Sequence, residues 1–149
     1  MAGMLDGIRV LSMGTVIAGP AASAIMSDWG ADVIKVEPPT GETFRGTPSA
    51  QGVSTGPINS LIQVFNRGAR GLAIDLVKDA GREAFYKLVQ KSDVFISNYE
   101  PGAIRKLKVD YASLSKVNPR LIHAVISGYG SEGPDKDERA YDFTAGWAR

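Results

Sequence analysis

The sequence contains no cysteine and only one histidine among its 149 residues. Both facts limit the kinds of metal site and catalytic site that the chain can form. Without cysteine the chain can form no disulfide, no thiolate metal site and no cysteine nucleophile. The single histidine, His123, lies inside an apolar run and is interpreted as a structural residue. A zinc site is therefore not expected, and a Ser-His-Asp triad has no G-x-S-x-G elbow to build on. The absence of cysteine fits a reducing compartment, so we expect a cytoplasmic protein without a bound metal.

The sequence also lacks an excess of charge and a long apolar run. Seventeen Lys and Arg residues stand against sixteen Asp and Glu residues, which leaves a net charge of +1. Neither nucleic acid nor a membrane surface is therefore expected as a partner. No segment approaches the roughly 18 consecutive apolar residues of a membrane span, and the first nine residues lack the basic start of a signal peptide. The remaining composition is typical of one globular domain.

The sequence does contain an alternation of strand-like and helix-like segments. Short apolar runs predict strands, and amphipathic or alanine-rich segments between them predict helices. The predicted strands cover residues 9–13, 32–37, 71–76, 93–97 and 121–126, and the predicted helices or helical turns cover residues 21–29, 60–66, 80–91, 102–107 and 111–117. This order predicts an α/β protein with a Rossmann-like, mainly parallel sheet, helices on both faces and right-handed crossovers.

The loops after the predicted strands are where a site is expected, because ligands bind beyond the carboxyl ends of parallel strands. These loops are residues 14–20, the segment after Glu37, residues 98–102 and residues 128–133. Residues 38–57 have no hydrophobic period and contain four glycines and four prolines. Such a length leaves two interpretations open, a functional loop and a tolerated surface insertion.

Two motifs near the end of the chain suggest a binding site, but each also has a purely structural interpretation. Residues 128–133 match G-x-G-x-x-G literally. A dinucleotide fingerprint must open a helix, whereas a polar, charged run from Pro134 to Arg139 follows here. We therefore interpret the motif as a flexible glycine loop and expect no NAD binding. Asp142 could cap a helix that starts at Phe143, or its carboxylate could line a site.

In their order and spacing, these segments resemble the class III (CaiB/BaiF-type) CoA-transferase family over nearly the whole chain. The resemblance rests on LDGIRVL at 5–11, AGP at 18–20, GADVIKVEP at 30–38, NRG at 66–68, LAIDL at 72–76, DVFISNY at 93–99, PG at 101–102, NPRLI at 118–122, GYG at 128–130, GP at 133–134 and YD at 141–142. It implies that residues 1–149 are the N-terminal, CoA-binding part of a Rossmann-like large domain, with the small domain absent, and that the full protein is an interlocked homodimer.

Members of this family move CoA from an acyl-CoA to a carboxylic acid through an aspartyl-CoA thioester. The resemblance implies that CoA is the ligand and that the nucleophilic aspartate lies beyond Arg149, so this chain alone is not expected to turn over. By the same resemblance, the mouth of the site is formed by Val16, Ile17, Ala18, Gly19 and Pro20. The nucleotide part of CoA contacts Ile74, Asn98 and Leu107, and its phosphates contact Lys106 and Arg139. The active site is lined by Ile17, Tyr141 and Asp142. Many relatives have a basic residue where this chain has Pro38. Whether this chain makes the contact that the basic residue makes with the adenine or a phosphate of CoA is therefore left open.

The resemblance leaves two alternatives to a transferase. Racemases of 2-methylacyl-CoA within the family have a histidine before the acid that Asp142 matches, and this chain has Tyr141 there, which favours transfer. Residues 141–145 further resemble the branch that transfers CoA to 2-hydroxy acids. The other alternative is a non-catalytic nucleotide-binding module that ends at Arg149. We also expect an exposed hydrophobic face where the rest of the family's structure would pack.

Overall fold

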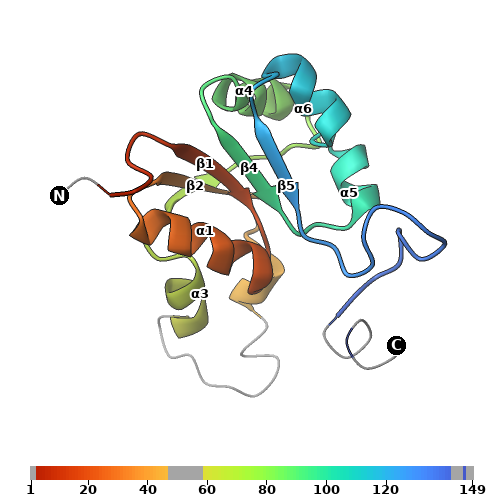
Figure 1. The fold of residues 1–149 in the computed structure, drawn as a ribbon, viewed down its shortest axis with the longest axis horizontal. Helices are drawn as coiled ribbons and strands as arrows, with labels where there is room; N and C mark the ends of the chain where they lie inside the picture. Colours follow the sequence, from red (N-terminus) through yellow and green to blue (C-terminus); the bar gives the residue numbers. More distant parts are fainter. Residues whose placement is uncertain (1–2, 47–58, 142–145, 147–149) are drawn as a thin grey trace.

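The computed structural model describes residues 3–46, 59–141 and 146, and within them a five-stranded sheet alternates with helices (Figure 1). Every strand pairing is parallel, and the strand order is β3-β2-β1-β4-β5. The elements are β1 (Arg9–Met13), α1 (Ala18–Asp28), β2 (Asp32–Glu37), the 3₁₀ helix η1 (Thr43–Arg45), α3 (Ser60–Phe65), β3 (Arg70–Ala73), α4 (Asp79–Val89), β4 (Val94–Ser97), α5 (Pro101–Lys106), α6 (Tyr111–Val117) and β5 (Ile122–Val125). The predicted α/β fold and parallel sheet are confirmed.

Helices cover both faces of the sheet, as expected (Figure 1). On one face, β-strand side chains such as Leu11, Val36 and Phe95 pack with Phe85 of α4 and Leu114 of α6. The core on the other face is smaller and contains Val10, Val33, Val94 and Ile96, with Met26 of α1 packed against it. The central strands β1, β2 and β4 are buried on both sides, which explains why they read as continuous apolar runs.

Two element boundaries differ from the sequence prediction for identifiable reasons. The helix predicted at 21–29 begins at Ala18, because Pro20 lies in its first turn, where the missing N–H removes no helical hydrogen bond. The strand predicted at 71–76 ends at Ala73. After Ala73 the chain turns across the end of β2, where the Ile74 N–H donates to the Glu37 carbonyl at 2.9 Å, and the Asp75 carboxylate then accepts the Val77 N–H at 3.0 Å.

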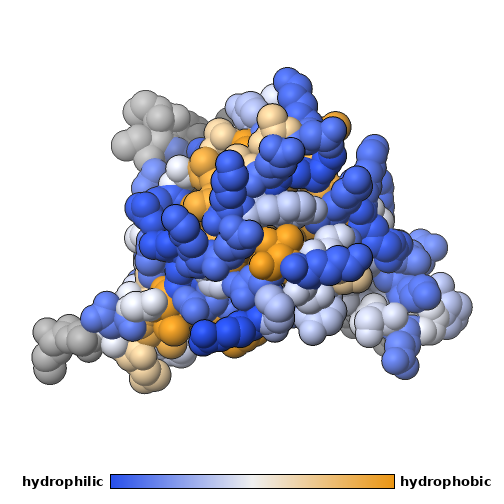
Figure 2. Space-filling model, turned by 90° about the horizontal axis from the view of Figure 1, so that it is seen from above, coloured by the Kyte–Doolittle hydropathy of each residue, from blue (hydrophilic) through white to orange (hydrophobic). Residues whose placement is uncertain are grey.

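The surface over α4 and α6 is mostly hydrophilic, and hydrophobic side chains show there only in separate patches (Figure 2). This agrees with the inward orientation of Phe85 and Val89 on α4, both fully buried. None of the described helices has the length and apolarity needed to cross a membrane. Ile122 and Val125 of the edge strand β5 are exposed.

Candidate functional site

A cleft of about 880 Å³ lies beyond the carboxyl ends of the strands, beside the point where the strand order reverses between β1 and β4. It is lined by residues 15–18 after β1, residues 38 and 40–43 after β2, residues 98–101 and 103 after β4, and residues 126–128, 136 and 138–141 after β5. The predicted loops therefore meet at one site. The glycine loop 128–133 contributes only Gly128 to the lining, and no helix follows it among the described residues up to 141, which agrees with the rejection of a dinucleotide fingerprint.

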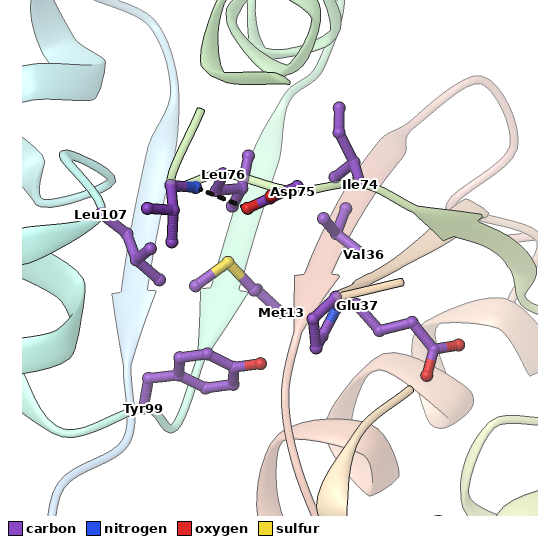
Figure 3. Close-up of a pocket in the computed structure, with 10 residues that line it drawn as sticks. Met13, Val36, Glu37, Ile74, Asp75, Leu76, Tyr99 and Leu107 are labelled. Carbon is purple, nitrogen blue, oxygen red and sulfur yellow. Dashed lines mark hydrogen bonds between the residues drawn. The ribbon is translucent and has the colours of Figure 1, made fainter. Parts of the chain in front are cut away.

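A second, smaller cavity of about 100 Å³ adjoins the cleft between the ends of β1, β2 and α5 (Figure 3). Its walls are mainly apolar, formed by Met13, Val36, Ile74, Leu76 and Leu107. Tyr99 and Pro38 line both the cavity and the cleft. The phenol oxygen of Tyr99 points toward the strand end that carries Glu37 (Figure 3).

The turn after β1 is fixed by Asn98 and by close backbone packing. The Asn98 Nδ2 donates to the Thr15 carbonyl at 3.0 Å, and its Oδ1 accepts the Thr15 N–H at 2.7 Å. A Cβ on Gly19 would lie 3.0 Å from Asn98 Oδ1 and from the Gly14 Cα, and one on Gly14 would lie 2.7 Å from Pro20 Cδ. The oxygen and one N–H of the Asn98 amide therefore bind the turn, and the second N–H can donate to a ligand.

A chain of buried charges continues from this turn. The Lys35 Nζ donates to Glu42 Oε1 and to the Gly14 carbonyl, both at 3.1 Å. Glu42 Oε2 accepts the Val16 N–H at 3.1 Å. The Glu42 N–H donates to Glu37 Oε2 at 3.0 Å. These groups connect the end of β2 to the mouth of the cleft through hydrogen bonds that satisfy each buried charge.

The pKa values of Glu37 and Tyr99 are displaced by this environment. Hydrogen bonds from Arg45 at 2.8 and 2.6 Å hold the pKa of Glu37 below its usual value. Burial raises the pKa of Tyr99, and the negative charges of Glu42 and Glu37 raise it further. The Tyr99 hydroxyl therefore stays protonated at neutral pH and can donate a hydrogen bond into the cavities.

The site residues suggested by the resemblance fall into distinct positions. Ile74 and Leu107 line the small cavity. Val16, Ile17, Ala18, Asn98, Arg139 and Tyr141 line the cleft. Gly19 and Pro20 are buried behind the turn, and Lys106 is exposed on α5 and lines neither cavity. Asp142 lies outside the described residues.

Two arginine side chains near the cleft, Arg105 and Arg139, form ion pairs at the surface. Arg139 Nε lies 3.1 Å from Glu100 Oε1, and Arg105 donates to Asp137 at 2.9 Å. Both pairs connect α5, or the residue just before it, to the segment after β5. His123 takes no part in the site: its Nε2 lies 3.0 Å from the Val109 carbonyl, and its ring stacks on Phe95. In the described ranges, no cluster of three His, Asp or Glu side chains could hold a metal ion.

Sequence reasoning missed Lys35, Glu42, Tyr99 and Met13. Lys35 did carry a signal, because a lysine inside an otherwise apolar, buried strand needs a partner. Glu42 carried none, since it lies in the loop 38–57, where no local pattern predicts what the side chain contacts. Tyr99 and Met13 become wall residues only once β1, β4 and the loop after β3 are brought together.

Comparisons with known proteins agree on one family. A model of CoA-transferase family III matches residues 5–149. The chain is 41% identical over 131 residues to a succinyl-CoA:mesaconate CoA-transferase of Haloarcula hispanica. It is 33% identical over 149 residues to an (R)-2-hydroxy-4-methylpentanoate CoA-transferase of Clostridioides difficile, and 33% identical over 147 residues to a cinnamoyl-CoA:phenyllactate CoA-transferase of Clostridium sporogenes.

Solved structures give the same result. A CaiB/BaiF family protein from Brucella suis is 35% identical with a TM-score of 0.84, over 96% of this chain and 38% of that one. A hypothetical protein from Mycobacterium tuberculosis is 33% identical with a TM-score of 0.85, over 96% and 39%. The three curated matches cover 86%, 98% and 98% of this chain but 33%, 37% and 36% of the relatives. The chain therefore spans about a third of their length.

Proposed function

The chain belongs to CoA-transferase family III, and from this premise we propose that it supplies the CoA-binding part of an enzyme that transfers coenzyme A between an acyl-CoA and a carboxylic acid. The observation that carries the proposal is the small apolar cavity that adjoins a larger cleft across Tyr99. CoA has a flat nucleobase at one end and a long polar arm that ends in the reacting thiol, so it needs two adjoining sites of this kind.

In the proposed arrangement the nucleobase occupies the small cavity between Ile74 and Leu107, with the Tyr99 hydroxyl as a donor to its ring nitrogens. The pantetheine arm follows the turn at Val16, Ile17 and Ala18, which presents exposed apolar surface to the cleft. The remaining N–H of the Asn98 amide can donate to an amide carbonyl of the arm.

The phosphates of CoA are proposed to bind near Arg139. Its ion pair with Glu100 is exposed, with 76% and 50% of the two side chains accessible, and pairs of this kind contribute little. A phosphate offers the guanidinium a stronger, bidentate partner and can replace Glu100. Lys106, exposed at the end of α5, is proposed to add charge to the same ligand group.

In the proposed reaction an aspartate carboxylate attacks the acyl thioester and expels CoA as its thiolate, which leaves a mixed anhydride. The thiolate then attacks the aspartyl carbonyl, which gives the aspartyl-CoA thioester and releases the donor carboxylate. We propose that this nucleophile belongs to a part of the protein beyond Arg149 and that the complete enzyme is a homodimer. Tyr141, at the position where racemases of the family have histidine, supports transfer over proton abstraction. A 2-hydroxy acid is the proposed acceptor, supported by the likeness to the (R)-2-hydroxy-4-methylpentanoate CoA-transferase.

Titration calorimetry with CoA, dephospho-CoA and NAD tests the proposal on this chain. We expect saturable binding of CoA, weaker binding of dephospho-CoA because it lacks one phosphate, and no binding of NAD. Leu107→Trp fills the small cavity and should abolish CoA binding, whereas Tyr111→Phe, on the exposed surface of α6, serves as the control. A folded sample that binds NAD as well as CoA would contradict the proposal.

A further inference from the structure

The turn after β1 holds a backbone conformation that its own residue does not favour. Val16 has a φ of 60°, in the left-handed region that a β-branched residue enters only when its surroundings enforce it. Val16 and the next two residues line the cleft. The strained residue is therefore at the surface that a ligand would contact, and the groups that enforce its conformation control the shape of that surface.

The groups that enforce it are Lys35 and Glu42. One carboxylate oxygen of Glu42 accepts the Val16 N–H, and the other accepts from Lys35, which also donates to the Gly14 carbonyl, each at 3.1 Å. The ion pair thus connects two backbone groups of one turn, on either side of Thr15. Because Asn98 holds both backbone groups of Thr15, every residue from Gly14 to Val16 is fixed by a side chain from elsewhere in the chain.

The burial of this pair indicates a geometric role. The Lys35 and Glu42 side chains are only 4% and 1% exposed. A buried ion pair contributes little net stability, because desolvation offsets the attraction, and apolar replacements of similar size are often neutral. Glu42 is itself oriented, since its N–H donates to Glu37, which Arg45 holds from the other side. The main physical effect of the pair is therefore to fix the turn.

We propose that Lys35 and Glu42 are positioning residues for the CoA arm, acting through the turn at Gly14–Val16. They hold Val16 in the left-handed conformation and so keep the turn in the shape that the ligand binds. The inference rests on the proposed function and deepens it, because it makes the affinity for the ligand depend on two residues whose side chains are almost entirely buried.

The decisive variant replaces both charges with apolar side chains of similar size, Lys35→Met together with Glu42→Leu. A positioning pair predicts an unchanged midpoint of thermal unfolding and an about tenfold higher Kd for CoA, because only a fraction of the molecules then hold the competent turn. A pair that serves stability alone predicts the reverse, a lower midpoint with an unchanged Kd, and that result would overturn the inference.

Nuclear magnetic resonance supplies a second measurement that needs no ligand. The Val16 amide proton donates to a carboxylate, so its resonance should move upfield in the double variant and in the isosteric Glu42→Gln. An unmoved Val16 resonance in both variants contradicts the positioning role. Arg70→Gln, at the opposite end of the sheet, should change neither this resonance nor the Kd. If the unaltered chain binds no CoA but the Val16 resonance responds, the proposed function fails while the structural part of the inference stands.

Discussion

The two ends of strand β2 carry the same kinds of charged side chain in opposite environments. At its first residue, Asp32 pairs with Arg9 at 2.8 Å and with Arg70 at 2.7 Å, and about a third or more of each side chain is exposed. Near its last residue, Lys35 and Glu42 are almost wholly buried and bind backbone groups of the neighbouring turn. The ion pairs at the amino end connect side chains to one another. At the carboxyl end, the paired side chains also form hydrogen bonds with the main chain of the turn that lines the cleft.

This difference shows how one strand can tolerate change at one end and restrict it at the other. Exposed pairs are screened by water and contribute about 0–1 kcal/mol, so the amino end tolerates change. Buried charges must be matched in position, because each unmatched one carries its full desolvation cost. The carboxyl end is therefore the more restrictive of the two, and it is the end that meets the cleft.

The largest effect is expected from removing one member of the buried pair. Lys35→Ala leaves the Glu42 carboxylate buried without its cation, which should lower the free energy of unfolding by about 3–5 kcal/mol. Urea denaturation followed by circular dichroism measures it. The matched change at the other end of the sheet, Arg70→Ala, should cost less than about 1 kcal/mol. Similar losses in the two variants would remove the distinction between the ends.

An intermediate effect is expected from acid. The pKa of Glu37 is lowered in the folded protein, first by Arg45, so its contribution to stability is present above the ordinary value of 4.5 and is lost as the pH falls through the lower, folded value. Unfolding measured from about pH 7 to pH 3 should show this loss. Arg45→Gln should reduce that acid sensitivity, and an unchanged pH profile in this variant would contradict the assignment.

The smallest effect is expected from Asp32→Asn. The pKa of Asp32 is lowered mainly by its hydrogen bond with Arg9 and then by Arg70, but about a third of the side chain is exposed to solvent. We expect a loss of less than about 1 kcal/mol in the free energy of unfolding, diminishing further in high salt. CoA binding by calorimetry should be unchanged. A marked loss of affinity would show that the amino end also communicates with the site.

The sequence predicted the fold well because the signal for it is local. Apolar runs located every described strand to within a few residues, and the loops at their carboxyl ends did meet at one cleft. The end of β3 was wrong because its partner strand β2 ends at Glu37, so the hydrogen bond from Ile74 to the Glu37 carbonyl is the last one of that ladder. No periodicity within residues 71–76 carries that information.

The site was predicted less completely, because its geometry depends on contacts between distant segments. The resemblance assigned Ile74 and Leu107 to the nucleotide part of CoA and Arg139 to its phosphates, and these roles stay predictions. The structure places the first two in the small cavity and Arg139 in the cleft. The resemblance did not anticipate that the Asn98 amide would be engaged by Thr15, or that Glu42 would support the turn. Such roles depend on the path of the loop after β2, which the pattern of residues there does not specify.

Tyr99, as a wall common to both cavities, makes their occupancies thermodynamically linked. A molecule in the small cavity and a molecule in the cleft would both contact this ring, so the first to bind can restrict the ring before the second binds. A ligand that fills both cavities also binds its second half at the high effective concentration set by its own linkage. Fragments such as adenosine and pantetheine should therefore bind this chain with positive cooperativity, each raising the affinity for the other.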